Sequence, residues 1–224
     1  MILFVGGTGT GVGKTTVTCA LAEILRRRGI HVGVSKPVAT GSSIFSGRKV
    51  SMDAVKLMRV AGRPMAEYRD VNPVLFDPPV SPHLAARLAR LPIRLAALRR
   101  RLHDMEKRFE LLLVEGIGGM ATPLTDRSTW ADFVSEFPRS KTLLVCSPKL
   151  GTLNHTLLSL EYLAHRKISC PFLVLSNYDP AHTGHRQNRA ELARLTRLPV
   201  LVCDRRGMLG DQKSLNTQIR RFDV

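Results

Sequence analysis

Residues 8–17 read TGTGVGKTTV and decide the fold of this chain. They follow a short apolar run, ILFV at residues 2–5, which predicts a buried strand. They precede a stretch with helical periodicity, in which Leu21 and Leu25 share one face and Gly29 stands where the helix would end. A strand, a glycine-rich turn ending in Gly-Lys-Thr and then a helix is the context of a phosphate-binding loop.

The chemistry of this loop predicts a nucleoside triphosphate as ligand. Glycines let several backbone N–H groups point at one anion, and the helix N-terminus adds about half a positive charge. Lys14 can reach the β- and γ-phosphates, and the Thr15 hydroxyl can bind a magnesium ion. The loop is one residue longer than the usual pattern, because Thr8 stands five residues before Gly13 and Gly7 one residue earlier. A Rossmann dinucleotide loop is disfavoured, since no G-x-G-x-x-G can be placed here.

Length and composition predict one α/β domain over residues 1–224 in a cytoplasmic enzyme. No apolar stretch approaches the roughly 20 residues of a membrane span, and no basic segment precedes the first apolar run, so neither a membrane partner nor a signal peptide is expected. The four cysteines are far apart, in or beside apolar segments, which is typical of buried thiols in a reducing compartment. They are Cys19, Cys146, Cys170 and Cys203.

The chain is strongly basic, with 34 Lys and Arg against 18 Asp and Glu and a formal charge of +16. A charge of this size raises the hypothesis of a nucleic-acid partner. The densest basic segment, residues 87–101, instead predicts an amphipathic helix interrupted near Pro92, and it holds no aromatic residue for base stacking. We therefore expect no specific nucleic-acid partner. The apolar face expected opposite the arginines consists of Leu84, Leu88, Leu91, Leu95, Leu98 and Leu102.

Apolar segments alternate with segments of helical periodicity along the whole chain. This alternation predicts an α/β fold of the P-loop NTPase type, with a mostly parallel sheet covered by helices on both faces. Ser51 is placed to cap the second helix and Gly62 to end it. The expected strands are residues 2–5, 31–35, 111–114, 142–146, 172–175 and 200–203, and the expected helices are residues 15–28, 52–61, 83–108, 153–165 and 187–195.

Candidate site residues follow several of the predicted strands. Lys36 opens the segment KPVATGS after the second strand, and Glu115 opens EGIGG after the third. Functional loops gather at the carboxyl ends of parallel strands, so both side chains are expected near the phosphate loop. Glu115 suits magnesium coordination there, with a carboxylate facing solvent as the alternative. Asn177 follows a later strand and could read a purine edge, or it could be an ordinary turn residue.

Taken together, these motifs resemble the dethiobiotin synthetase family, the ATP-dependent enzymes that close the ureido ring in biotin synthesis. The resemblance extends from Val5 to about Pro180, and it includes the longer phosphate loop, which this family uses. The order and spacing of the segments carry it: GTGTGVGKT at residues 7–15, KPVATGS at 36–42, Asp53, VNP at 71–73, SPH at 81–83, VEGIGG at 114–119 and KLGTLNH at 149–155.

The resemblance implies a reaction and its participants. A carbamate forms from carbon dioxide and one amine of 7,8-diaminopelargonic acid, ATP phosphorylates it, and the second amine closes the ring with release of phosphate. Lys14 and Lys36 resemble the two lysines that hold the γ-phosphate and the carbamate, and Thr10 resembles a further phosphate ligand. The expected small molecules are therefore ATP, the diamine and CO2, with Mg2+ as cofactor.

The remaining site residues are also assigned by resemblance. Thr15, Asp53 and Glu115 resemble the magnesium ligands, and Asn177 resembles the amide that reads adenine. The segment at residues 151–154 resembles the part that reaches the substrate carboxylate across a dimer interface, so a homodimer is expected. The implied sets are Lys36, Lys14 and Thr10 for catalysis; Gly11, Val12, Gly13, Lys14, Thr15, Thr16, Asp53, Glu115 and Asn177 for the nucleotide; and Lys36, Thr40, Gly118, Leu150, Gly151 and Asn154 for the substrate.

The chain also departs from the family pattern. Gly9 and Gly11 stand where the family has acidic residues, and Thr40 replaces a serine but keeps a hydroxyl. Residues 202–206 lack the proline-containing strand end that helps to hold the base, so weak discrimination among nucleotide bases is expected. Two alternatives stay open: a nucleotide-dependent switch of the partition or septum-positioning kind, and a related amidoligase with another small substrate. Residues 6–9 lack the early lysine that many such switches carry, which counts against the first.

Overall fold

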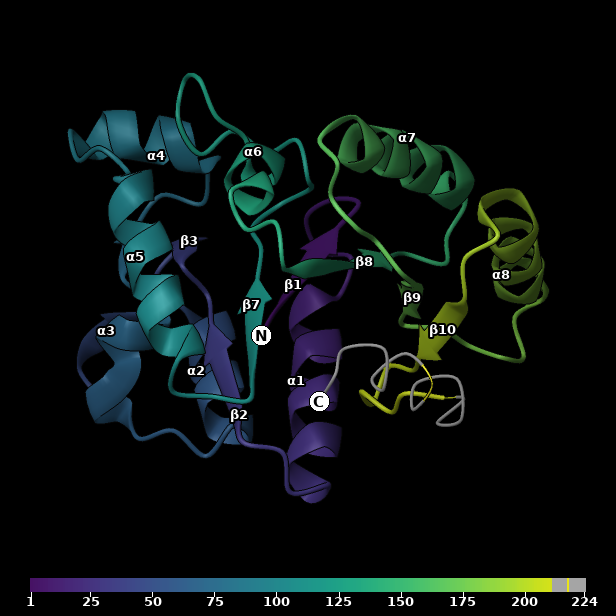
Figure 1. The fold of residues 1–224 in the computed structure, drawn as a ribbon, viewed down its shortest axis with the longest axis horizontal. Helices are drawn as coiled ribbons and strands as arrows, with labels where there is room; N and C mark the ends of the chain where they lie inside the picture. The colour runs from purple at the N-terminus through teal and green to yellow at the C-terminus, as the bar shows by residue number, and fades with distance from the viewer. Residues whose placement is uncertain (211–216, 218–224) are drawn as a thin grey trace.

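A parallel sheet of six strands forms the centre of the protein, in the order β10-β9-β8-β1-β7-β2 (Figure 1). The computed structural model describes residues 1–210 and residue 217. Neighbouring strands all run parallel. All six predicted strands are confirmed, with ends that shift by up to two residues. The strands are β1 (Ile2–Gly7), β2 (Val32–Ser35), β7 (Leu111–Glu115), β8 (Lys141–Cys146), β9 (Leu173–Ser176) and β10 (Val200–Cys203).

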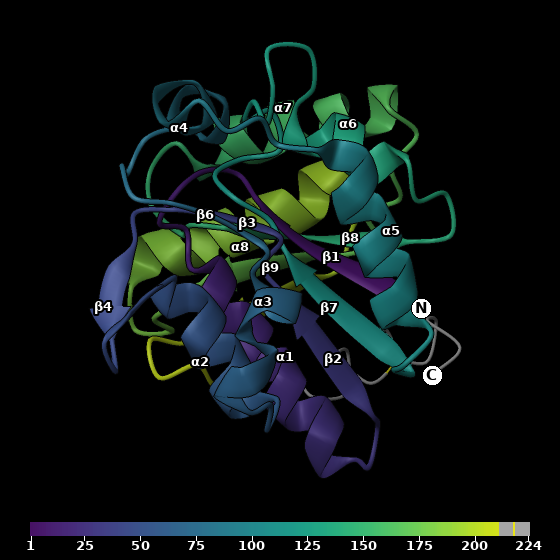
Figure 2. The same cartoon turned by 90° about the vertical axis from the view of Figure 1, so that its left-hand side faces the viewer.

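Helices cover both faces of the sheet, as the alternation of segments predicts. Side chains alternate along β1, so that Leu3 and Val5 pack on one face while Ile2 and Phe4 pack on the other. Figure 2 shows the sheet between α1 and α2 on one side and α6 and α7 on the other. The first face carries α1 (Lys14–Arg27) and α2 (Met52–Val60), and the second carries α5 (Leu95–Glu106), α6 (Trp130–Ser135), α7 (Thr152–His165) and α8 (Thr183–Thr196).

The segment between β2 and β7 contains short elements that were not predicted from the sequence. Two of its strands form a parallel pair, and two others form an antiparallel hairpin. Each of these strands has only three residues, which is too short for a periodic pattern to emerge. The elements are β3 (Val38–Thr40), β4 (Ser43–Phe45), β5 (Arg48–Val50), the 3-10 turn Met65–Glu67, α3 (Tyr68–Val71) and β6 (Val74–Phe76); α6 was also not predicted.

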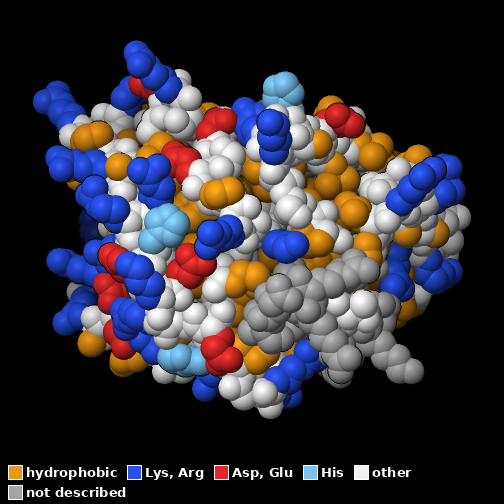
Figure 3. Space-filling view, in the orientation of Figure 1, with side chains coloured by type: hydrophobic (Ala, Val, Ile, Leu, Met, Phe, Trp, Pro, Cys, Tyr) orange, Lys and Arg blue, Asp and Glu red, His pale blue; other side chains and the backbone are white. Residues whose placement is uncertain are grey.

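The basic segment around Pro92 forms two helices, α4 (Pro82–Ala89) and α5, so the predicted interruption is confirmed. The predicted apolar face is wrong in its first half, because Leu88 and Leu91 are each 62% exposed. The reason is that α4 packs on the core through small alanines, which leaves these leucines on the outside. The second half is confirmed, since Leu98 and Leu102 are buried. Lys and Arg side chains gather over α4 and α5 at the left of Figure 3.

The predicted boundaries of α2 are also confirmed. The Ser51 side chain accepts a hydrogen bond from the Ala54 N–H at 3.4 Å, and Gly62 follows the helix with φ of +66°. In the described part of the chain, no helix is long and apolar enough to cross a membrane.

The cysteines only partly match the expectation of buried thiols. Cys146 and Cys203 are buried, whereas Cys19 and Cys170 are partly exposed. All four thiols are free, and desolvation by burial raises the pKa of each to about 12. At neutral pH they are therefore protonated and poor nucleophiles.

Candidate nucleotide-binding active site

The phosphate loop joins β1 to α1 and leaves the N-terminus of that helix free. Gly13 precedes the helix with φ of +96°, in the left-handed region. A Cβ atom at this position would lie 2.1 Å from the Ser176 Oγ, so only glycine fits. No side chain caps α1, and its first turn holds no acidic residue. Its unpaired N–H groups and positive dipole end are therefore available to an anion.

Lys14 is the first residue of α1, and its ammonium group lies inside the site. The side chain is buried, and Nζ donates to the carbonyl oxygens of Gly9 and Gly118, each at 2.7 Å. Desolvation by burial, followed by repulsion from Lys36, lowers the pKa of Lys14 to about 8. Both acceptors are neutral, and a phosphate oxygen forms a stronger hydrogen bond with an ammonium group. The lysine is thus held where an anion can replace its present partners.

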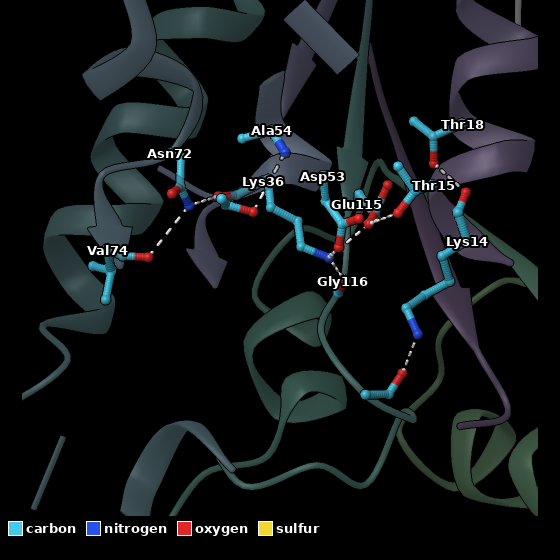
Figure 4. Close-up of polar contacts among 12 residues, drawn as sticks. Lys14, Thr15, Thr18, Lys36, Asp53, Ala54, Asn72, Val74, Glu115 and Gly116 are labelled. Atoms are coloured by element: carbon cyan, nitrogen blue, oxygen red, sulfur yellow. Dashed lines mark hydrogen bonds and ion pairs between the residues drawn. The ribbon is translucent and has the colours of Figure 1, made fainter. Parts of the chain in front are cut away.

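Lys36 and Glu115 form a buried ion pair beside the loop (Figure 4). Lys36 directly follows β2 and Glu115 is the last residue of β7, and these neighbouring strands end at the same edge of the sheet. The Lys36 Nζ donates to the Glu115 Oε1 at 2.6 Å and to the Gly116 carbonyl oxygen at 2.8 Å. Asp53, from the first turn of α2, brings its Oδ2 to 3.6 Å from the same ammonium group. The expectation that these strand ends meet at the loop is confirmed.

The oxygen atoms around Glu115 fit a magnesium ion. The Thr15 hydroxyl donates to the Glu115 Oε1 at 2.9 Å, and the Glu115 Oε2 is buried without a hydrogen-bond partner in the described part of the chain. Within that same part, no cluster of three or more His, Cys, Asp and Glu side chains could hold a metal ion. Magnesium commonly binds through one or two protein carboxylates, with substrate phosphates and water completing its coordination shell. One hydroxyl and two carboxylates, from Thr15, Asp53 and Glu115, are such a donor set.

These groups line a cavity of about 660 Å³, which lies within the range typical of small-molecule sites. Several lining residues were not predicted as site residues, among them Ser43, Ser51, Lys56 and Thr122. Lys56 lies three residues after Asp53 on α2, a spacing that places both on one face of the helix and could have indicated it. The predicted residues that line the cavity are Thr10, Gly11, Gly13, Lys14, Thr15, Thr16, Lys36, Thr40, Asp53, Glu115 and Gly118.

Five predicted site residues lie outside this cavity. Val12 packs against the hydrophobic core instead. Asn177 follows β9 with φ of +57°, and its Nδ2 lies 3.4 Å from the position of a Cβ on Gly13, so it adjoins the loop. The other three, Leu150, Gly151 and Asn154, are exposed where β8 leads into α7.

The loop after β7 closes another side of the site with small residues. Gly118 adopts φ of +61°, and the Gly119 N–H donates to the Thr122 hydroxyl at 2.8 Å. A Cβ on Gly116 would lie 2.6 Å from the Nε1 of Trp130, the one tryptophan of the chain. The loop is therefore packed tightly between the phosphate loop and α6, and Trp130 is a natural fluorescent reporter of its state.

A larger cavity of about 860 Å³ lies elsewhere, between β5, α3 and α5. Its lining includes Arg48, Arg69 and Arg101 but no residue of the phosphate loop. The candidate nucleotide-binding residues Lys14, Lys36 and Glu115 therefore line the smaller cavity.

The fold and the site define a P-loop nucleotide-binding protein of the α/β class. The cell division ATPase MinD of Pyrococcus furiosus shares the fold, with a TM-score of 0.52 and 19% identity over 91% of this chain and 82% of that one. A family model described as an AAA domain matches residues 2–203.

Curated relatives identify the family more closely. ATP-dependent dethiobiotin synthetase BioD of Halalkalibacterium halodurans is 34% identical over 88% of this chain and 81% of its own length. ATP-dependent dethiobiotin synthetase BioD 1 of Escherichia coli K12 is 33% identical over 88% of this chain and 87% of its own length. The chain belongs to the dethiobiotin synthetase family.

Proposed function

We propose that this protein is an ATP-dependent dethiobiotin synthetase, which uses ATP to carboxylate 7,8-diaminopelargonic acid and close its ureido ring. The observation that carries the proposal is the arrangement of Lys14, Lys36 and Glu115 around one cavity, in a chain whose relatives bear that name. Two lysines from different elements face the same space, as the transfer of a phosphoryl group between two anions requires.

The proposed reaction has three steps. One amine of the diamine attacks carbon dioxide and loses a proton, which gives a carbamate. A carbamate oxygen then attacks the γ-phosphorus of ATP, and ADP leaves, which gives a carbamoyl phosphate. The second amine attacks the carbonyl carbon, loses a proton and expels phosphate, which closes the ring. Lys14 and Lys36 stabilise the oxygen atoms that gain negative charge as the phosphoryl group moves.

The other assignments extend the same proposal. Thr15, Asp53 and Glu115 would hold Mg2+, and the free, buried Oε2 of Glu115 supports this. The bound ion would neutralise part of the phosphate charge. Thr40 and Gly118 lie on the cavity wall, where the diamine would bind.

A homodimer would complete the site. Leu150, Gly151 and Asn154 are exposed outside the cavity of their own chain, so a substrate contact from them fits a neighbouring subunit better. Helix α7 also exposes Leu158, at 63%, and hydrophobic side chains are visible near this helix in Figure 3. Leu163 of the same helix is not available to a partner, because it is buried in the core of its own chain.

An assay of phosphate release with ATP, diamine and bicarbonate tests the proposed function. We expect release to depend on both the diamine and bicarbonate, and mass spectrometry to detect dethiobiotin. Equal ATP hydrolysis without the diamine would favour a nucleotide-dependent switch. Turnover that requires a different amine acceptor would favour a related amidoligase.

A further inference from the structure

A chain of hydrogen bonds runs from Lys36 to the N-terminus of α2. The Asn72 side chain is buried, and its Nδ2 donates to the Lys36 carbonyl oxygen at 2.6 Å and to the Val74 carbonyl oxygen at 3.3 Å (Figure 4). Its Oδ1 accepts from the Tyr68 hydroxyl at 2.7 Å. That hydroxyl in turn accepts from the Ser51 N–H at 2.6 Å. Every polar atom of the Tyr68 and Asn72 side chains therefore forms a hydrogen bond.

Both ends of this series of hydrogen bonds hold groups of the candidate active site. Lys36 lies between β2 and β3, where no strand pairing fixes its backbone. Its N–H donates to the Val71 carbonyl oxygen at 2.8 Å, and its carbonyl oxygen is the one that Asn72 binds, so the end of α3 holds both of its backbone polar groups. Ser51 is the N-cap of α2, two residues before Asp53.

We propose that Tyr68 and Asn72 are positioning residues that hold Lys36 and Asp53 in the relative positions that the reaction needs. The inference rests on the proposed function, because it assigns these two residues a role in that same site. Lys36 has a long, flexible side chain, so fixing its backbone limits where its ammonium group can lie. The same hydrogen bonds fix the start of α2, which carries Asp53 toward that ammonium group at 3.6 Å.

The chemistry of the hydroxyl suits this role. Burial raises the pKa of Tyr68 above its usual value, so the hydroxyl stays protonated at neutral pH and keeps donating to Asn72. A tyrosine hydroxyl can accept one hydrogen bond while it donates another, which a phenylalanine ring cannot do.

Tyr68→Phe tests the proposal, because it removes one oxygen atom and leaves the ring in place. Residues that orient a ligand-bearing group typically contribute about 10- to 100-fold to metal affinity or activity. We expect kcat for diamine-dependent phosphate release to fall by at least about tenfold. We expect the dissociation constant of metal-free ADP to change little, because Lys14 and the phosphate loop are untouched. The dissociation constant of Mn2+ from the complex with ADP, measured by electron paramagnetic resonance of free Mn2+, should rise by about tenfold.

Arg69→Ala is the matched control, since Arg69 is an exposed residue of the same short helix. It should leave kcat and the Mn2+ dissociation constant unchanged. Asn72→Ala is a second variant, in which the Lys36 carbonyl oxygen loses its donor, and it should lower kcat at least as much as Tyr68→Phe.

A purely structural role predicts a different pattern. If Tyr68→Phe and Asn72→Ala lower only the melting temperature and leave kcat and Mn2+ affinity within about twofold of wild type, the proposal is wrong. The Mn2+ measurement does not depend on the diamine. A wild-type protein without diamine-dependent turnover would therefore overturn the proposed function, while the Mn2+ affinities would still decide whether Tyr68 and Asn72 position the site.

Discussion

The Nζ of Lys36 lies 2.6 Å from the Oε1 of Glu115, and neither residue is more than 4% exposed. Taking two charges out of water is costly, and their attraction offsets this cost only when the geometry and the surrounding hydrogen bonds are good. Here the Gly116 carbonyl oxygen and the Thr15 hydroxyl complete the arrangement. A well-packed apolar pair would stabilise the fold as well, so we infer that this ion pair serves the reaction proposed for the site.

Breaking this pair from one side should destabilise the protein. Glu115→Gln leaves the buried Lys36 without its nearest counter-charge, and Asp53 at 3.6 Å replaces it only in part. We expect the free energy of unfolding in urea to fall by about 3 kcal/mol. The double variant Lys36→Met/Glu115→Gln should lose less stability than Glu115→Gln alone, since no buried charge remains unpaired. Additive losses in the double variant would show that the pair is not coupled.

The lowered pKa of Lys14 predicts a pH dependence of stability. Between the folded pKa of about 8 and the usual value of 10.5, the unfolded chain holds a proton that the folded chain has released. The free energy of unfolding therefore gains a contribution from Lys14 as pH rises through this window.

Lys14→Met removes this titration and provides the comparison. The stability of wild type minus that of the variant should increase by about 2 kcal/mol between pH 7 and pH 10, measured by urea denaturation at each pH. A difference that is constant with pH would mean that the Lys14 pKa is not lowered.

The proposed dimer predicts that a charge on α7 separates the subunits. Leu158→Glu places a carboxylate at a position that is 63% exposed in the single chain, so the fold of each subunit should survive. Light scattering should show a dimer for wild type and a monomer for the variant. Turnover should fall more than ATP binding, because Leu150 to Asn154 would no longer reach the neighbouring cavity. A fully active wild-type monomer would contradict the proposal.

We expect weak discrimination among nucleotide bases, because few of the described side chains beside the phosphate loop are placed to bind a base. Asn177 is exposed beside Gly13. The Oδ1 of Asp204 accepts from the N–H groups of Arg206 and Met208, so this oxygen is engaged within its own turn. Phosphate contacts do not depend on the base. We expect kcat/KM for ATP, GTP and CTP to agree within about tenfold, or about 1.4 kcal/mol. A preference for ATP of a hundredfold or more would show that the base is read.

The sequence was sufficient to predict the sheet and the approach of Lys36 and Glu115 to the phosphate loop. The apolar runs are nearly continuous, and parallel strands bring their carboxyl ends to one edge, so Lys36 and Glu115 had to approach the loop. Their direct ion pair was not predicted, because it depends on side-chain directions at two strand ends.

Other features lie beyond what periodicity can indicate. The hydrogen bonds of Tyr68 and Asn72 depend on α3, which has four residues, and on strands of three residues. The exposure of Leu88 was missed because α4 uses alanines for its core contact, and a helical pattern favours the larger leucines. The local sequence predicts neither these hydrogen bonds nor the exposure of Leu88, because tertiary packing determines both.

In the proposed reaction, Lys36 acts on the acceptor side of phosphoryl transfer while Lys14 holds the nucleotide. The most direct measurement compares wild type and Lys36→Ala in phosphate release with ATP, diamine and bicarbonate, alongside ATP binding followed by the fluorescence of Trp130. We predict that Lys36→Ala binds ATP within about threefold of wild type but loses at least about 99% of diamine-dependent release, a difference of about 2.7 kcal/mol or more in the barrier. Full turnover in Lys36→Ala would contradict the account.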